Sequence, residues 1–287
     1  MPLGLAGMGL ADSALALIVS LFVMGFGYSL MDICLNSQGF IVERIVKKRC
    51  MSSLHAMWSL GAFLTTVVGG SIARFVAYEV NLVAIAIFAG IAFIPAAFFL
   101  LPADLDDHDG GEEETSAKIP LFGKSVVPLW GLGIGLLGCM IAEGAASDWA
   151  GILLRDDMGY GKGVNASAYA SFALAMITAR FLGDRALDYF GPARLVRMCG
   201  YFGAIGWAAS IAIAVPLSDA HPLVALVIIN LGFVIAGLAI GPMFPAFILA
   251  ASAIPGIAPS VSSARAFVIG LSGFFIGPSI IGFLAEG

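Results

Sequence analysis

Long runs of apolar residues alternate with short polar segments along almost the whole chain. Each run is roughly 20 residues or longer, which is the length that an α-helix needs to cross a lipid bilayer. Since lipid offers no hydrogen-bond partner to the backbone, these runs are predicted to be helices, and the alternation typical of a membrane β-barrel is absent. The eight runs lie at about Ala14–Ile41, Leu54–Val76, Val80–Leu101, Val126–Ala146, Ala168–Leu187, Leu195–Val215, Leu223–Leu249 and Val261–Leu284.

The composition indicates the same class of protein. Of the 287 residues, 60% are hydrophobic and 11% are charged, whereas a soluble domain has about 25% charged residues. This excludes an ordinary soluble domain and a disordered chain, and the net charge of −5 excludes a strongly basic nucleic-acid-binding protein. The cysteines form no CxxC motif, so we interpret them as small hydrophobic residues rather than as disulfides or metal ligands: Cys34, Cys50, Cys139 and Cys199.

One long polar segment divides the runs into a group of three and a group of five. Residues 102–124 contain seven acidic side chains and are predicted to be a solvated linker. We therefore expect one helix bundle over residues 1–101 and a second over residues 125–287. Lysine and arginine gather in this linker and in the loops after the first and fifth runs, which the positive-inside rule assigns to the cytoplasm. The same count of lysine and arginine residues assigns both ends of the chain to the side of the membrane opposite the cytoplasm.

A short repeat and two local motifs suggest how the helices are organised. Ser52–Met57 resembles Ser262–Phe267 at an offset of 210 residues, which is typical of transporters built from two parallel halves. Two such halves need a chain of about 400 residues, so we expect spans beyond both ends of this chain. Gly241-Pro242 and Pro245 are predicted to break the seventh run, and the GxxxG pair Gly273 and Gly277 predicts close helix packing.

Three stretches resemble the major facilitator superfamily, and in particular its fucose-permease-like sugar transporter branch. They are Gly25–Gly70, Glu143–Trp149 (EGAASDW) and Ala179–Arg197 (ARFLGDRALDYFGPARLVR). This resemblance implies an all-α membrane protein with two helix bundles. The runs would correspond to family helices 4 to 11, and residues 1–10 to the end of helix 3. The first bundle would then lack its first helices and the second bundle its last.

Asp32 and Asn36 are the sharpest polar signal within an apolar run. They are four residues apart and therefore share one face of the predicted helix. A carboxylate at membrane depth is costly unless it faces a cavity or is protonated. The residues alone allow two interpretations, a proton carrier that binds solute hydroxyls or a structural hydrogen bond to a neighbouring helix. The resemblance implies that Asp32 takes part in proton-coupled sugar binding.

Three more polar residues lie within the apolar runs or near their ends. His55 can donate and accept hydrogen bonds and titrates near neutral pH, and the resemblance implies a substrate-facing position. A hydrogen bond at a helix interface is the alternative. Glu143 is a second acid at membrane depth and Asn230 is a further cavity candidate, so both are expected to contact the solute or the proton.

The segment around Arg180, Asp184 and Arg185 carries a separate expectation. We interpret it as the cytoplasmic end of the fifth run, where Arg180 and Asp184 can pair at i, i+4. It resembles the superfamily's cytoplasmic gating loop, which implies a conformational role rather than substrate contact. Simple anchoring by positive residues at the membrane surface is the alternative.

These observations predict a secondary active transporter. We expect it to move a sugar or another small polar solute across the inner (plasma) membrane, coupled to protons, by alternating access. The expected partners are the lipid bilayer, the solute and the proton, without cofactor, metal or nucleic acid. An inactive truncated transporter is the main alternative. A membrane-embedded enzyme is disfavoured, because the sequence has neither GxSxG nor HExxH.

Overall fold

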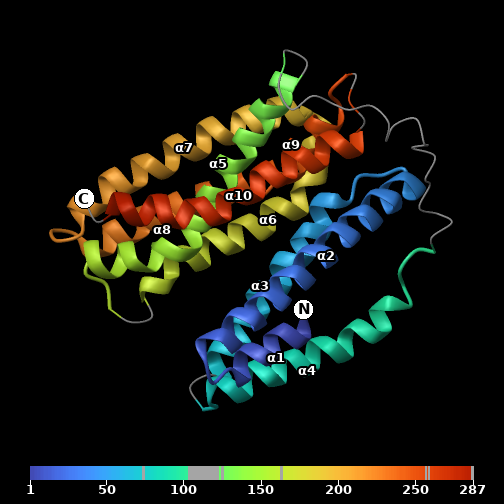
Figure 1. Cartoon of the computed structure of the whole chain (residues 1–287). Coiled ribbons are helices and arrows are strands. Elements are labelled where there is room, and N and C mark those ends of the chain that lie inside the picture. The colour runs from blue at the N-terminus through green and yellow to red at the C-terminus, as the bar shows by residue number, and fades with distance from the viewer. Residues whose placement is uncertain are drawn as a thin grey trace. The chain divides into compact units, whose positions relative to one another are not determined.

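The computed structural model describes residues 1–72, 75–102, 123, 126–161, 164–255, 257 and 259–285. Within these residues the regular structure is helical and no strand occurs, as Figure 1 shows. This confirms the predicted all-α class. The α-helices are α1 (Pro2–Leu10), α2 (Ala14–Val46), α3 (Met51–Ile72), α4 (Tyr78–Ala97), α5 (Val127–Ile152), α6 (Ser167–Phe190), α7 (Pro192–Leu217), α8 (Pro222–Ile240), α9 (Met243–Ser252) and α10 (Pro259–Ala285).

Local sequence explains where several helices begin and end. Pro192 and Pro222 open α7 and α8 in the first turn, where the missing N–H of proline has no intrahelical partner to lose. The hydroxyl of Ser13 accepts a 3.2 Å hydrogen bond from the Ala16 N–H and caps α2. Gly191 ends α6 with φ +72°, a left-handed conformation that favours glycine. Since Pro192 follows at once, α6 and α7 are joined by a single-residue turn.

Seven helical segments in the described part of the chain are long and apolar enough to cross a membrane. They correspond to seven of the eight predicted runs. The eighth run is α3, whose 22 residues span about 33 Å, comparable with the roughly 30 Å hydrocarbon core. The sequence of α3 includes His55 together with several serine and threonine residues. The acidic residues of the predicted linker lie outside the described residues.

The seventh run is interrupted as predicted. It consists of α8, which ends at Ile240, and α9, which begins at Met243, with Gly241 and Pro242 between them. Pro242 has no N–H to donate to the helix of α8. Pro245 lies in the first turn of α9, where its missing N–H breaks no helical bond. The bend is therefore centred on Gly241-Pro242 alone.

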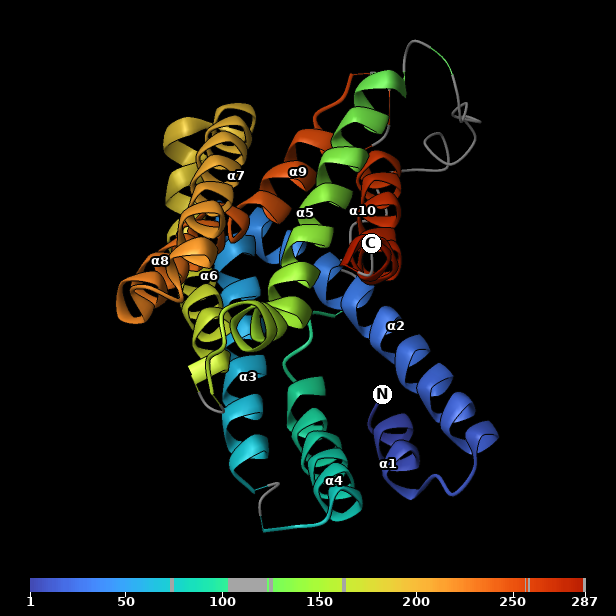
Figure 2. The ribbon, with the colours of Figure 1, turned by 90° about the vertical axis from the view of Figure 1, so that its left-hand side faces the viewer.

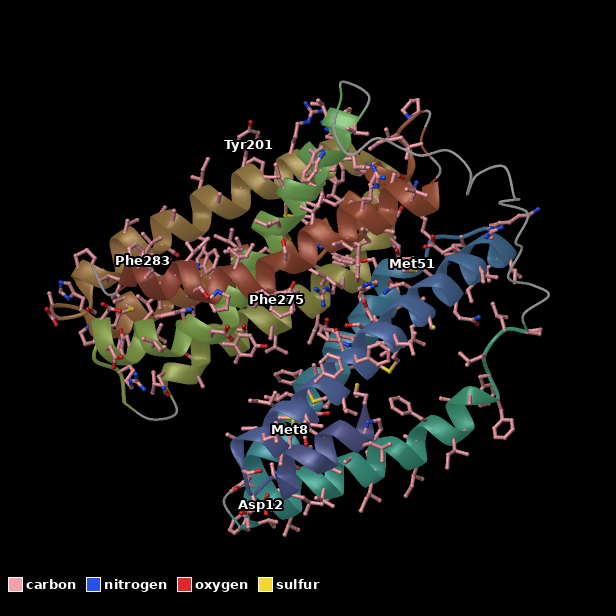
Figure 3. The ribbon with its side chains drawn as sticks, viewed as in Figure 1. Met8, Asp12, Met51, Tyr201, Phe275 and Phe283 are labelled. Carbon is pink, nitrogen blue, oxygen red and sulfur yellow. The ribbon has the colours of Figure 1, made fainter. Side chains whose placement is uncertain are left out.

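The chain divides into two compact units. Unit 1 comprises residues 1–54 and 60–111, and unit 2 comprises residues 55–59 and 112–287. The large, fully buried side chains in the core of unit 2 include Leu136, Phe172, Ile229 and Phe233. Tyr201 and Phe283 lie at its outer surface, as Figure 3 shows. Apolar side chains on the outside match a lipid environment.

Unit 1 is built from α1, α2, α4 and the parts of α3 outside residues 55–59, with α1 packed against α2 and α4. Two side chains of α2 join it to other parts of the unit. Oε1 of Glu43 accepts hydrogen bonds of 2.6 and 2.8 Å from the N–H groups of Cys50 and Met51, which caps the start of α3. Oε1 of Gln38 accepts a 2.8 Å bond from the Leu101 N–H just after α4.

Glycine contacts bring α5 and α10 of unit 2 together. The two helices lie side by side in Figure 1 and Figure 2. A Cβ at Gly273 would lie 2.6 Å from the backbone oxygen of Leu137, and one at Gly277 would lie 3.3 Å from the Ile141 side chain. At Gly273 only a residue without a side chain permits this approach, and at Gly277 a Cβ would make a tight contact. The close packing predicted from the GxxxG pair is confirmed.

We predict that Gly273→Ala destabilises unit 2. The added methyl group meets backbone rather than a flexible side chain, and overpacking of this kind costs about 1–3 kcal/mol. Gly138→Ala on α5 is the matched control, because a Cβ there meets nothing within 4 Å. Thermal unfolding of the detergent-solubilised protein should show a lower Tm for Gly273→Ala only. Equal Tm values for the two variants would contradict the packing described here.

Candidate functional site

A buried ion pair joins α5 and α6 near the middle of the membrane-crossing segments. Nη2 of Arg180 lies 3.4 Å from both carboxylate oxygens of Glu143. Arg180 is near the centre of α6, and Glu143 is near the centre of the span Val127–Asp157. The two side chains are 5% and 14% exposed. A carboxylate and a guanidinium removed from water in this way must compensate each other's charge.

Small residues lie close in sequence to both members of the pair. Gly144 and Ala146 follow Glu143 on α5 and are buried, as are Ala179 and Gly183 on either side of Arg180. Residues of this size let neighbouring helices approach each other. The EGAA and ARFLG segments therefore combine one charge with small neighbours.

The pair is loose in its geometry. Charge-assisted hydrogen bonds between nitrogen and carboxylate oxygen are usually about 2.7–2.9 Å long, and both Glu143 contacts are 3.4 Å. Coulombic attraction rather than short hydrogen bonding holds the two groups. Separating the two groups therefore loses little hydrogen-bond energy. The electrostatic cost of the separation depends on which group then takes the place of the missing partner.

Residues 55–59 of α3 belong to the same compact unit as this pair. Nη1 of Arg180 donates a hydrogen bond to Oγ of Ser59. The Ser59 hydroxyl in turn donates a 3.0 Å bond to the backbone carbonyl of His55, one helical turn earlier. The His55 ring centroid lies 5.1 Å from that of Phe244. The contacts thus run from Glu143 through Arg180 and Ser59 to the backbone of His55. They connect three residues that the sequence predicted, His55, Glu143 and Arg180.

Asn230 takes part in a different arrangement, which joins α6 to α8. Its Oδ1 accepts a 2.8 Å bond from the Ser171 hydroxyl. Its Nδ2 donates 3.2 Å to Ser167 Oγ and 2.8 Å to the backbone carbonyl of Leu226. Both ends of the amide are therefore engaged, and Asn230 connects two helices. Sequence reasoning considered it only as a cavity residue.

Asp32 and Asn36 lie near the middle of α2 in unit 1. Nδ2 of Asn36 donates a 2.8 Å hydrogen bond to the backbone oxygen of Asp32, as their spacing on one helix face allows. Both side chains are partly exposed. The acid is therefore close to an amide and is not fully enclosed within its own unit.

The predicted gating segment is divided between two environments. Asp184 is buried on α6, and Arg185, the next residue, is exposed. Arg180 lies further from the helix end than expected, because α6 continues to Phe190, and it faces Glu143. A helix carries residues four apart on the same face, but only tertiary packing decides which neighbour that face meets.

The sequence analysis did not pair Glu143 with Arg180. The available signal was one acid and one base at similar depth in consecutive spans, which short connections make antiparallel neighbours. Within the described residues, no group of three histidine, cysteine or acidic side chains has the arrangement of a metal site. All four cysteines are free thiols, and among them only Cys139 is fully buried.

Helices that are long and apolar enough to cross a membrane, with an ion pair buried near the middle of two of them, define a polytopic membrane protein. Residues 1–278 match the Major Facilitator Superfamily, and the chain belongs to this family. The chain is 29% identical over 284 residues to the uncharacterized transporter y4wD of Sinorhizobium fredii, covering 98% of this chain and 71% of that protein.

Two further relatives have similar coverage. The chain is 27% identical over 285 residues to an uncharacterized MFS-type transporter of Yersinia pestis, with 96% of this chain and 67% of that protein aligned. It is 28% identical over 284 residues to the membrane protein MosC of Rhizobium meliloti, with 96% and 63% aligned. Family membership and the transporter names of relatives identify a transporter rather than an enzyme.

We predict an asymmetric response to loss of either charge. Glu143→Gln leaves a buried guanidinium that cannot lose its proton, and should destabilise the protein by about 3–5 kcal/mol. Arg180→Gln should cost less, because the remaining carboxyl can take up a proton. The double variant should recover a large part of the loss in Tm.

The exposed pair Arg155 and Asp156 is the control. Its side chains are 60% and 52% exposed, so neutralising either one should change the Tm little. Additive losses in the Glu143 and Arg180 double variant would show that the two groups do not interact.

Proposed function

We propose that the protein is a proton-coupled secondary transporter that moves a sugar or another small polar solute across the plasma membrane. One observation carries this proposal: the ion pair between Glu143 and Arg180 is buried near the middle of two spans. Ionisable residues at this depth are costly and mark solute or ion pathways in membrane proteins. The resemblance to fucose-permease-like proteins supports a sugar as the solute.

Alternating access fits the helices of unit 2. In transporters of this type the solute site lies near the bilayer midplane, and bundles rock around it. The interruption at Gly241-Pro242 gives α8 and α9 a bend that allows their two parts to reorient. The buried carboxyl of Asp184 and the adjacent Arg185 would act at the gating segment, away from the solute.

Two carboxyl groups are candidates for proton coupling. Asp32 lies near the middle of α2 and Glu143 near the middle of its span. A carboxyl group at membrane depth is less costly in its protonated form, because the neutral form avoids the desolvation cost of a charge. Protonation therefore makes the conformational changes of the transport cycle easier. Proton binding and release at these groups would link solute movement to the proton gradient.

Uptake into proteoliposomes tests this proposal. A panel of labelled sugars is offered with and without an imposed pH gradient, and the gradient should drive accumulation of at least one solute. Asp32→Asn should abolish gradient-driven accumulation but retain exchange of labelled for unlabelled solute, since Asn cannot carry a proton. The control is Asp219→Asn, an exposed position after α7.

Unchanged gradient-driven accumulation in Asp32→Asn would contradict its role as the proton carrier. Uptake of no solute, with or without a gradient, would contradict the transport proposal for this chain.

A further inference from the structure

We propose that the connection between α2 and α3 binds the headgroup of an anionic phospholipid, such as phosphatidylglycerol, in the cytoplasmic leaflet of the membrane. This α2–α3 turn, residues 44–50, lies entirely within unit 1, and the positive-inside rule assigns it to the cytoplasmic side. It contains no acidic residue and four cations, Arg44, Lys47, Lys48 and Arg49. The inference concerns an interaction surface and does not depend on which solute is transported.

A carboxylate at the base of the α2–α3 turn fixes its backbone. Oε1 of Glu43 accepts hydrogen bonds of 2.6 and 2.8 Å from the N–H groups of Cys50 and Met51. Between these points Lys47 has φ +52°, and it is the one residue other than glycine with a positive φ in the described part of the chain. Glycine adopts this left-handed conformation at lower cost than lysine does. The turn therefore holds a cation at a position where glycine would be less strained, which points to a role for the charge.

Three of the four cations are available to a partner outside the protein. Arg44, Lys47 and Lys48 are exposed, and the structure gives none of them a hydrogen bond or an ion pair with another described residue. Arg49 is half-buried and interacts with other residues, so it is not counted here. Arg44 lies in the last turn of α2, where a cation also favours the negative end of the helix dipole. Lys47 and Lys48 lie beyond the helix.

Two apolar side chains beside these cations indicate a lipid rather than a soluble anion. Ile45 and Val46 end α2 and are 54% and 59% exposed. At the surface of a membrane, apolar side chains enter the boundary of the acyl chains while neighbouring cations contact the phosphates. Groups of lysine and arginine next to a membrane helix attract anionic lipids in this way. A free phosphate would leave Ile45 and Val46 in water.

The basic residues after α6 provide a contrast within the same protein. Arg194 and Arg197 are also exposed, but both are held by the protein. The guanidinium of Arg194 lies 5.8 Å from the centroid of the Phe190 ring, and Nε of Arg197 donates a 3.2 Å hydrogen bond to the backbone carbonyl of Ala193. Either group of cations can serve the positive-inside bias. If membrane orientation were the whole role of the α2–α3 turn, the two groups would respond to lipid alike.

Lipid binding by the purified full chain tests the inference. The protein in detergent is titrated with phosphatidylglycerol or with phosphatidylcholine of the same acyl chains, and native mass spectrometry measures the fraction that retains lipid. One variant is the triple substitution Arg44→Gln, Lys47→Gln and Lys48→Gln. The second is Lys47→Gly, which removes one charge and eases the left-handed backbone. The double substitution Arg194→Gln and Arg197→Gln is the matched control.

The unmodified protein should bind phosphatidylglycerol about tenfold or more tightly than phosphatidylcholine, and added salt should reduce this preference. Each cation removed should weaken phosphatidylglycerol binding about fivefold. Lys47→Gly should therefore lose about this factor, and the triple variant should lose the preference. The control variant should retain it. Glycerophosphate, which carries the phosphate without acyl chains, should not displace the lipid.

Four results would overturn the inference. The first is equal binding of the two lipids by the unmodified protein, and the second is an equal loss of preference in the control variant. The third is displacement of the lipid by glycerophosphate, which would indicate a site for soluble anions. The fourth is a lower Tm of the triple variant in detergent without lipid, which would show that these cations bind a partner within the protein. The expected Tm is unchanged.

Discussion

The absence of hydrogen-bond partners in lipid governs this structure at every level. Backbone groups satisfy one another within helices, and several prolines, such as Pro192, Pro222 and Pro242, lie in a first turn or at a bend, where the missing N–H matters least. Polar side chains follow the same constraint, and several of them find partners inside the protein. Asn230 bonds to Ser171 and Ser167, and Arg180 faces Glu143. Glycines such as Gly273 then provide the close helix contacts that a hydrophobic driving force cannot supply within lipid.

This constraint also explains why an ion pair is useful for transport. A single buried charge would destabilise the unit, whereas a compensated pair is tolerated and remains responsive to protons. Its two members differ in character, since a carboxyl group can be neutralised and a guanidinium cannot. Protonation of Glu143 therefore changes the negative charge that the surroundings of Arg180 must supply to balance its guanidinium. In the transport cycle proposed above, that need links proton uptake to solute binding.

Much of the fold could be predicted from the sequence, because apolar runs and helix breakers are local signals. The start of α2 at Ala14, the interruption at Gly241-Pro242 and the contact at Gly273 were all accessible in this way. Helix ends were less accurate, since α5 extends beyond its predicted end through a π-helical turn over Leu153–Asp157. Polar groups near the ends of spans are compatible with either continuation or termination of a helix.

The site was harder to predict than the fold. Sequence spacing showed which residues share a helix face, as it did for Asp32 and Asn36. It did not show how α5 and α6 are rotated about their axes, and this rotation brings Glu143 to Arg180. The same limitation applied to Asn230, whose partners are about 60 residues away in sequence. Pairings between helices depend on tertiary packing, which one sequence does not encode in a simple pattern.

The central claim is that the Glu143 and Arg180 pair lies on the solute pathway. The most direct measurement is the reactivity of Glu143→Cys, in a variant whose native cysteines are replaced, towards membrane-impermeant thiosulfonate reagents of either charge. The account predicts reaction from the aqueous phase, faster with the anionic reagent than with the cationic one, because Arg180 attracts anions. It also predicts protection by the transported solute. Absence of reaction with both reagents would contradict it and assign the pair a purely structural role.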